Sequence, residues 1–159
     1  MISLLPMTQR EFEEYFDNAV QRLAEDSIVA GNIQPDSANK WAGELLNKIL
    51  SEGLNTPDHF FYSIVDDNLD KKVGYLRFSI REENNLRFPC LSDIIIFPAY
   101  RLQSYATHVM RLLEEKVQSL GFDEIKLHVY AHNHVAKTLY EKLGYRATNI
   151  QMTRKLSEN

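Results

Sequence analysis

The feature that most constrains the fold of this chain is a unit of strand, turn and helix that spans residues 92–120. Residues 94–97 form an unbroken apolar run that ends at Pro98, which is typical of a strand covered on both faces. After a polar turn, apolar residues recur with helical spacing at Tyr105, Val109, Leu112, Leu113, Val117 and Leu120. The unit predicts a buried strand that leads directly into an amphipathic helix.

The turn between this strand and this helix is the predicted site of the chemistry. It starts at Arg101 and carries small polar residues into the first turn of the helix. A helix N-terminus has backbone N–H groups without intrahelical partners, and it is the positive end of the helix dipole. Because Arg101 adds a full positive charge nearby, the sequence predicts a phosphate-binding turn.

Two segments resemble the conserved motifs of one enzyme family. Arg101-x-x-Ser104-x-Ala106 is similar to the Arg/Gln-x-x-Gly-x-Gly/Ala signature of the GNAT superfamily of acetyl-CoA-dependent N-acetyltransferases. The family's second segment, Asn-x-x-Ala-x-x-Leu-Tyr-x-x-x-Gly-Phe/Tyr, is matched by Asn133, Ala136, Leu139, Tyr140, Gly144 and Tyr145. The order and separation of the two segments also agree with the family.

The turn departs from the family pattern at two positions. Relatives usually carry Gly where this chain has Leu102 and Ser104, because a backbone pressed against a pyrophosphate leaves little room for a Cβ atom. Backbone donors survive either replacement, so binding of acetyl-CoA is expected to be retained.

The resemblance implies acetyl-CoA as the co-substrate, with no metal. The turn is expected to hold the pyrophosphate, and the exposed backbone of the strand to pair with the pantetheine arm, with the Ile96 N–H stabilising the developing oxyanion. By resemblance Asn133 contacts the pantetheine region. The expected cofactor-binding residues are Ile94, Ile95, Ile96, Arg101, Leu102, Gln103, Ser104, Tyr105, Ala106, Thr107, Asn133, Ala136 and Tyr140.

The resemblance also assigns a general acid. Asn133 and Tyr140 are seven residues apart, about two helical turns, and therefore share one face of a helix. By resemblance the Tyr140 hydroxyl donates a proton to the departing thiolate. The structural alternative for Tyr140 is a core aromatic residue.

The general base is a choice between two residues. An amine with a pKa of about 10 is mostly charged at neutral pH and must lose a proton before it attacks the thioester. The candidates are Asp93, at the start of the apolar run, and His128, on the next predicted strand, where some relatives carry a carboxylate. Their structural alternatives are a partner for an arginine or loop amide, for Asp93, and a hydrogen-bonded histidine, for His128. Ordered water is a third way to deprotonate the amine.

Two classes of function fit these residues. The first is an enzyme that transfers an acetyl group from acetyl-CoA to a primary amine, such as a small amine, a polyamine or a protein amine, by direct attack on the thioester. The alternative is a catalytically degenerate protein that binds acetyl-CoA and serves as a regulatory or interaction module.

The composition of the chain argues against several classes of binding partner. The net charge of −4 argues against nucleic acid, and no segment is apolar for long enough to cross a membrane. The N-terminus lacks a secretory start, so the expected location is the cytoplasm. Cys90 is the only cysteine, which excludes an internal disulfide, and the histidines near His128 lack a carboxylate or thiolate at metal-ligand spacing. A monomer or a homodimer is expected.

The remaining patterns complete a single GNAT-like domain over residues 1–159. Strands are predicted at 1–6, 59–65, 73–80, 86–97, 124–130 and 147–155, and further helices at about 8–26, from 36 or 37 to about 53, and at 133–143. Thr8 and Glu11 have the spacing of a capping box. The predicted fold class is α/β, or more closely α+β, with a mixed, mostly antiparallel sheet of about six or seven strands and about four helices.

Overall fold

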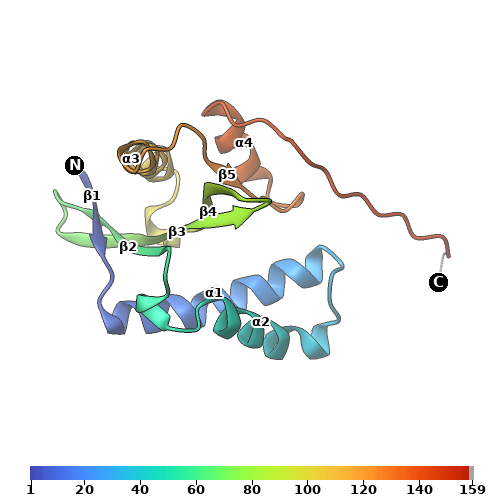
Figure 1. Cartoon of the computed structure of the whole chain (residues 1–159). Coiled ribbons are helices and arrows are strands. Elements are labelled where there is room, and N and C mark those ends of the chain that lie inside the picture. Colours follow the sequence, from blue (N-terminus) through green and yellow to red (C-terminus); the bar gives the residue numbers. More distant parts are fainter. Residues whose placement is uncertain (158–159) are drawn as a thin grey trace.

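The computed structural model describes residues 1–157, and its strands form one sheet in chain order (Figure 1). These strands are β1 (Ile2–Pro6), β2 (His59–Asp66), β3 (Lys71–Glu83), β4 (Leu86–Ile96) and β5 (Lys126–Leu127). Neighbouring strands from β1 to β4 are antiparallel, whereas β4 and β5 are parallel. The sheet is therefore mixed and mostly antiparallel, which confirms the predicted class.

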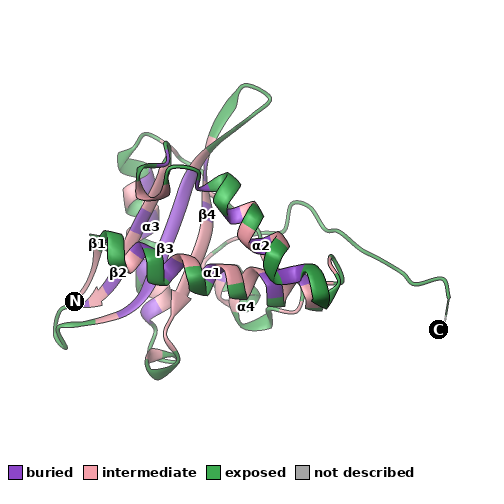
Figure 2. Ribbon diagram, turned by 90° about the horizontal axis from the view of Figure 1, so that it is seen from below, coloured by how far each residue is buried: buried purple, intermediate pink, exposed green. Residues whose placement is uncertain are grey.

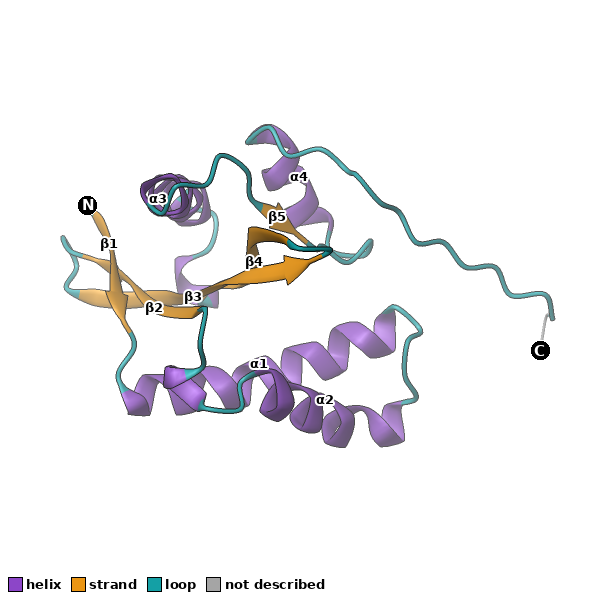
Figure 3. Ribbon diagram, in the orientation of Figure 1, coloured by secondary structure: helices purple, strands orange, loops and turns teal. Residues whose placement is uncertain are grey.

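Helices cover both faces of this sheet (Figure 3). The helices α1 (Gln9–Val29) and α2 (Pro35–Ile49) lie on one face, and α3 (Tyr105–Ser119) and α4 (His134–Lys142) lie on the other. The predicted capping box is present at the start of α1, where Thr8 and Glu11 exchange hydrogen bonds of 3.0 and 3.2 Å. The cap of α2 was expected at Asp36 or Ser37, but the helix begins earlier because Pro35 occupies its first turn.

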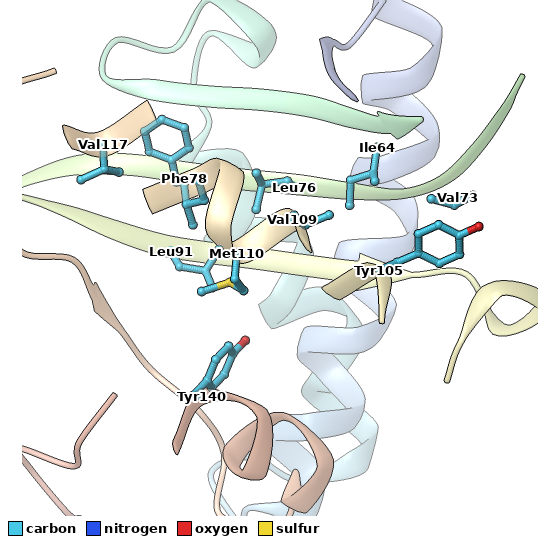
Figure 4. Close-up of a cluster of buried hydrophobic side chains, with 11 residues drawn as sticks. Ile64, Val73, Leu76, Phe78, Leu91, Tyr105, Val109, Met110, Val117 and Tyr140 are labelled. Carbon is cyan, nitrogen blue, oxygen red and sulfur yellow. The ribbon is translucent and has the colours of Figure 1, made fainter. Parts of the chain in front are cut away.

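Apolar side chains of the sheet and of the helices fill the space between each helical layer and the sheet. Under α3 and α4 they form a cluster of buried residues that includes Ile64, Leu76, Phe78, Val109 and Met110 (Figure 4). Under α1, Phe12 and Tyr15 pack against Phe61 and Tyr75 with tilted or edge-on rings. Buried positions accordingly run along the middle of β3 (Figure 2).

The C-terminal part of the sheet is shorter than the sequence predicts. The strand expected at 124–130 is reduced to the two residues of β5, and the strand expected at 147–155 does not form. Residues 146–157 instead run away from the domain as an extended, exposed tail (Figure 1). The sheet therefore has five strands within residues 1–157, not six or seven, because neither segment has a strand beside it along its full length. Within the same residues, no helix has the length and apolar character needed to cross a membrane.

Candidate active site

The site is built around a place where two parallel strands diverge. β5 pairs with β4 only at Cys90 and Leu91, so within residues 1–157 the edge of β4 from Ser92 onward has no paired strand. The Phe97 N–H donates to the Val73 carbonyl in β3 at 2.8 Å. Because backbone groups of alternate residues point to opposite edges of an antiparallel strand, Ile94 and Ile96 direct theirs to the open edge. This edge offers free backbone donors for an extended ligand.

Arg101 closes part of that edge. Its Nε donates to the Ile96 carbonyl at 3.0 Å, across the short helical turn formed by Pro98–Tyr100. The carbonyl is thereby satisfied, while the N–H of the same residue still points to the open edge. The bond also fixes the position of the positive charge of Arg101 next to the start of α3.

The turn before α3 has the backbone conformation that glycine favours. Leu102 and Ser104 both have φ of 63°, in the left-handed region. The Leu102 side chain is fully exposed, and the Ser104 side chain makes no capping hydrogen bond. The N–H groups of Tyr105, Ala106 and Thr107 begin the helix and have no intrahelical acceptor, so the turn fits a phosphate.

The second predicted segment lies on α4. Asn133 is the N-cap of the helix, and its Oδ1 accepts a hydrogen bond of 3.3 Å from the Ala136 N–H. Two turns along, Tyr140 is 8% exposed, and its hydroxyl points toward the strands (Figure 4). Burial, aided by the negative charge of Asp93, raises the pKa of Tyr140 to about 12. The phenol therefore stays protonated at neutral pH, as an acid must.

Asp93 is held by a network of side chains from α1 and β3. Arg22 donates two hydrogen bonds of 2.7 Å, one to each carboxylate oxygen, and the Tyr15 hydroxyl adds a third of 2.9 Å. Arg77 Nε donates to the Tyr15 hydroxyl at 2.9 Å. Burial, together with the charge of Asp93, raises the pKa of Tyr15 well above its usual value, so its hydroxyl remains a donor. This is the arginine partnership named as the alternative role of Asp93.

Three of these residues, Tyr15, Arg22 and Arg77, were missed by the sequence prediction. Tyr15 was assigned to the apolar stripe of the first helix and packs there as expected. Arg22 lies seven residues later and therefore on the same face of the helix. A positive charge on an apolar face was the signal that a buried carboxylate lies opposite.

His128 lies on the other side of the gap between the strands. Leu127 and Val129 pack against the cluster under α3 and α4, so the side chain of His128 points to the opposite face, toward α1. It is exposed and has edge-on contact with the Tyr130 ring, at 5.0 Å between centroids. Among residues 1–157, no other group forms a hydrogen bond with its imidazole.

The turn after His128 contacts the C-terminal end of α1. His132 Nε2 lies 2.8 Å from Asp26 Oδ1, and the hydroxyls of Ser27 and Tyr130 are 3.4 Å apart. His132 therefore has a structural partner. In the part of the chain that the structure describes, no three or more histidine, cysteine or acidic side chains gather where they could hold a metal ion.

A sheet that splits after Leu91, a turn that leads into the N-terminus of α3 and a buried phenol on α4 are the features expected of an acyl-CoA-dependent transferase. The family described as Acetyltransferase (GNAT) family matches residues 12–145. The chain belongs to the GNAT family of N-acetyltransferases, which use acetyl-CoA to acetylate amines.

Individual relatives agree over almost the whole chain. The uncharacterized N-acetyltransferase YycN of Bacillus subtilis is 31% identical over 98% of this chain and 99% of its own, and YdgE of the same organism is 28% identical over 97% and 98%. The crystal structure of YycN matches this chain with a TM-score of 0.93 and covers 99% of it and 100% of that chain. AAC(6')-Iy, solved in complex with the bisubstrate analog CoA-S-monomethyl-acetylneamine, shares the fold with a TM-score of 0.60 at 16% identity, over 99% of both chains.

Proposed function

We propose that this chain binds acetyl-CoA along the open edge of β4 and transfers its acetyl group directly to a primary amine. The observation that carries the proposal is the divergence of β4 and β5 after Leu91, because it leaves strand backbone free beside a turn shaped for phosphate. The Tyr140 hydroxyl points from α4 toward the strands, which supports its inclusion in the same proposed site (Figure 4).

The residues of the chain divide the work of holding the co-substrate. The N–H groups from Leu102 to Thr107, with Arg101 beside them, hold the pyrophosphate. The backbone of residues 94–96 pairs with the pantetheine arm as an added strand would. Asn133 and Ala136, at the first turn of α4, contact the same arm.

The transfer itself needs one group that donates a proton and one that accepts a proton. The nitrogen of the amine substrate forms a bond to the thioester carbon, and the bond from that carbon to sulfur breaks. The Ile96 N–H stabilises the charge that develops on the carbonyl oxygen, and Tyr140 delivers its proton to the departing sulfur. The proton lost by the amine passes to a base on the face covered by α1.

Of the two candidate bases, the geometry favours His128. Asp93 has three hydrogen bonds from Arg22 and Tyr15, so accepting a proton would break an ion pair. His128 is exposed on the same face, and a neutral imidazole has one ring nitrogen that can accept a proton. We assign Asp93 the role of fixing Arg22 and α1 beside the gap, and His128 the role of the base.

The test is release of free thiol from acetyl-CoA in the presence of a panel of small amines, polyamines and peptides with free amines. The expected result is thiol release above the rate without enzyme for one class of amine, and calorimetric binding of CoA tighter than millimolar. Protection against thermal unfolding by acetyl-CoA without turnover on any amine would identify the alternative, a non-catalytic acetyl-CoA-binding protein. No binding of CoA would contradict both.

A further inference from the structure

Arg77 on β3 is a buried arginine without a carboxylate partner. It is 8% exposed, and among residues 1–157 no acidic side chain forms an ion pair with its guanidinium. Its hydrogen bonds go to two neutral groups, from Nε to the Tyr15 hydroxyl at 2.9 Å and from Nη1 to His59 Nδ1 at 3.4 Å. Burial of a charge is costly unless the charge is paired. Arg77 is therefore a candidate binding group for an anionic ligand.

The end of this guanidinium has N–H groups to offer such a ligand. Nη2 has no hydrogen-bond partner within residues 1–157. In the buried and half-buried residues of this range, the Tyr145 hydroxyl is the one side-chain nitrogen or oxygen that is both buried and unpaired, so Nη2 of Arg77 reaches the surface. Nη1 has a second N–H beside the one directed to His59. The two nitrogens together can bind the two oxygens of one anion.

His59 adds a donor without adding a charge. A guanidinium only donates, so His59 Nδ1 accepts the bond from Arg77, and the proton of the neutral ring lies on Nε2. Burial, together with the charge of Arg77, lowers the pKa of His59, which keeps the ring neutral at pH 7. The charge of Asp58 acts in the opposite direction, but this carboxylate is paired with Arg87 at 3.3 Å.

The buried groups around Arg77 carry one net positive charge. Arg22 and Arg77 are both positive, and Asp93, which is bound by Arg22, is the one carboxylate among them. Tyr15 is neutral, because burial raises its pKa. A ligand group with a single negative charge balances this cluster, whereas a polyamine would bring like charge to it. The balance favours a carboxylate over a doubly charged phosphate.

Arg77 lies beside the proposed place of acetyl transfer. It pairs with Asp93 in the register of β3 and β4, and Ile94, the next residue of β4, directs its backbone to the open edge. The bond to Tyr15 places Arg77 on the face covered by α1, to which His128 also points. Neighbouring strands are about 4.8 Å apart, so one or two strand widths separate Arg77 from the open edge. A small molecule can bridge this distance.

We propose that the acceptor of this enzyme is a small amine that carries a carboxylate, as an amino acid does, and that Arg77 and His59 bind this carboxylate. The inference rests on the proposed transfer from acetyl-CoA to an amine. A guanidinium fork matches the two oxygens of a carboxylate. The amine nitrogen bonds to the acetyl carbon as the bond from that carbon to sulfur breaks, His128 takes the amine proton, and Tyr140 protonates the sulfur. The products are CoA and an N-acetylated amino acid.

The experiment measures kcat/KM of the wild type with acetyl-CoA and matched pairs of acceptors. Each pair consists of a linear amino acid, from glycine and β-alanine to longer homologues, and its amide, which keeps the amine and removes the negative charge. The expected result is a kcat/KM at least about 100-fold higher for the acid in the best pair, because the amide leaves buried donors unpaired. Equal or faster acetylation of amides or polyamines would overturn the inference and leave the proposed transfer intact.

Arg77→Lys tests whether this residue is the source of the preference. Lysine keeps the positive charge but lacks the planar fork, so the ratio of kcat/KM between acid and amide is expected to fall at least about tenfold. Arg81→Lys is the matched control, since Arg81 lies on the same strand, is exposed and pairs with Glu83, and its ratio should equal that of the wild type. A purely structural role of Arg77 would lower both activities together and leave the ratio unchanged, which would overturn the inference.

Calorimetry separates this inference from the proposed function. The wild type loaded with CoA should bind at least one acid of the series about 100-fold more tightly than its amide, and this measurement needs no turnover. Absence of acetylation on every amine would contradict the proposed transfer, while preferential binding of the acid would still support recognition of a carboxylate. Equal binding of acid and amide, or binding of neither, would overturn that recognition.

Discussion

At the scale of single residues, burial determines what the side chains of this site can do. Tyr15, Tyr140 and Tyr145 are phenols in which burial raises the pKa, so they remain proton donors over the whole physiological range. Their hydroxyls differ in their partners. Tyr15 is occupied by Asp93 and Arg77, and Tyr145 has no partner among residues 1–157, whereas Tyr140 faces the gap between the strands. Only the last is placed to donate a proton to a ligand.

Replacing Tyr140 by Phe tests this assignment. The substitution keeps the ring and its packing and deletes only the donor, so turnover is expected to fall roughly 100-fold while acetyl-CoA affinity and unfolding free energy change little. Tyr145→Phe is the matched control, since it removes a buried hydroxyl from a neighbouring ring and should leave turnover intact. Steady-state kinetics and urea unfolding of both variants decide the matter. Near-normal turnover in Tyr140→Phe would end the proposal.

The base is tested by the pH dependence of the rate. His128→Gln should flatten the acidic limb of kcat/KM, because the group whose ionisation limits the rate is gone. Asp93→Asn should keep that limb and instead lose about 1–3 kcal/mol of stability, since Arg22 is left without its counter-charge. Both variants would be assayed from about pH 6 to 9. If the limb disappears in Asp93→Asn alone, the two roles are reversed.

The residues of the candidate site could be predicted from the sequence where they lie close together in the chain. Asn133 and Tyr140 share a helix, so seven residues of spacing were enough to place them together. Asp93 and Arg22 are 71 positions apart, and no short-range pattern joins them. The arginine partner of Asp93 could be identified only when the packing of α1 across the sheet was known.

At the scale of elements, the turn before α3 carries a conformational cost. Residues other than glycine pay about 1–2 kcal/mol in the left-handed region, and both Leu102 and Ser104 adopt it. From the sequence, the only reason for glycine at these positions is the lack of room for a Cβ atom beside the pyrophosphate. The structure adds the backbone angle as a second reason, which no single sequence could supply.

Glycine at either position is expected to stabilise the chain by up to about 1 kcal/mol, after the greater entropy of the unfolded chain is deducted. Ser104→Gly should also bind acetyl-CoA as tightly as the wild type or more tightly. Gln103→Gly is the matched control, because its φ is not positive, and it should lose about 0.4–1 kcal/mol. Chemical denaturation and calorimetry give both quantities. A tenfold loss of affinity in Ser104→Gly, about 1.4 kcal/mol, would make the Ser104 hydroxyl a direct ligand.

The strand that carries Ile94 and Ile96 depends on a glycine across from it. A Cβ atom at Gly74 would lie 2.0 Å from the Ile95 carbonyl oxygen, so β3 and β4 would have to move apart. Gly74→Ala is expected to cost about 3 kcal/mol and to weaken acetyl-CoA binding. Gly43→Ala, on α2 with open space around it, should instead gain about 0.5–1 kcal/mol. A Gly74→Ala chain with wild-type unfolding and affinity would contradict this account.

Local sequence patterns predicted the helices, and they predicted the strands that pair with a neighbour in the sequence. The capping box at Thr8 was predicted correctly, and β2, β4 and α3 were predicted to within one residue of their ends. β3 extends two residues before and three residues beyond its predicted range. The segment at 147–155 alternates between polar and apolar residues from Asn149 to Thr153 but does not pair within residues 1–157. A pattern of period two predicts that a segment can be a strand, whereas pairing depends on which edge lies within reach.

At the scale of the whole molecule, α1 crosses the sheet and joins β2, β4 and the turn before α4. Along its length, Glu11 accepts a hydrogen bond from Ser63 at 2.7 Å, Arg22 binds Asp93, and Asp26 lies 2.8 Å from His132. One helix thus spans from β2 to the turn before α4. Both sides of the gap between β4 and β5 are bonded to α1. The width of this gap is therefore set by how α1 packs on the sheet.

The buried phenols make the stability of the whole fold sensitive to alkaline pH. Unfolded tyrosines ionise near pH 10, whereas Tyr140 in the folded chain keeps its proton until about pH 12. Between these values the folded state binds more protons than the unfolded state, so the unfolding free energy falls as the pH rises. Tyr15 and Tyr145 contribute in the same direction, because burial raises their pKa as well.

The contribution of Tyr140 is isolated by comparison with Tyr140→Phe in urea titrations at pH 8 and pH 11. The pKa of Tyr140 is about two units higher in the folded chain than in the unfolded chain. At pH 11 this difference lowers the unfolding free energy of the wild type by about 1.4 kcal/mol, and the variant has no such loss. The stability of the wild type relative to Tyr140→Phe should therefore fall by that amount between the two pH values. If the difference between the two proteins is the same at both pH values, Tyr140 ionises as freely in the folded chain as in the unfolded one. The phenol would then be hydrated rather than buried. Burial could no longer be used as an argument that Tyr140 is the proton donor.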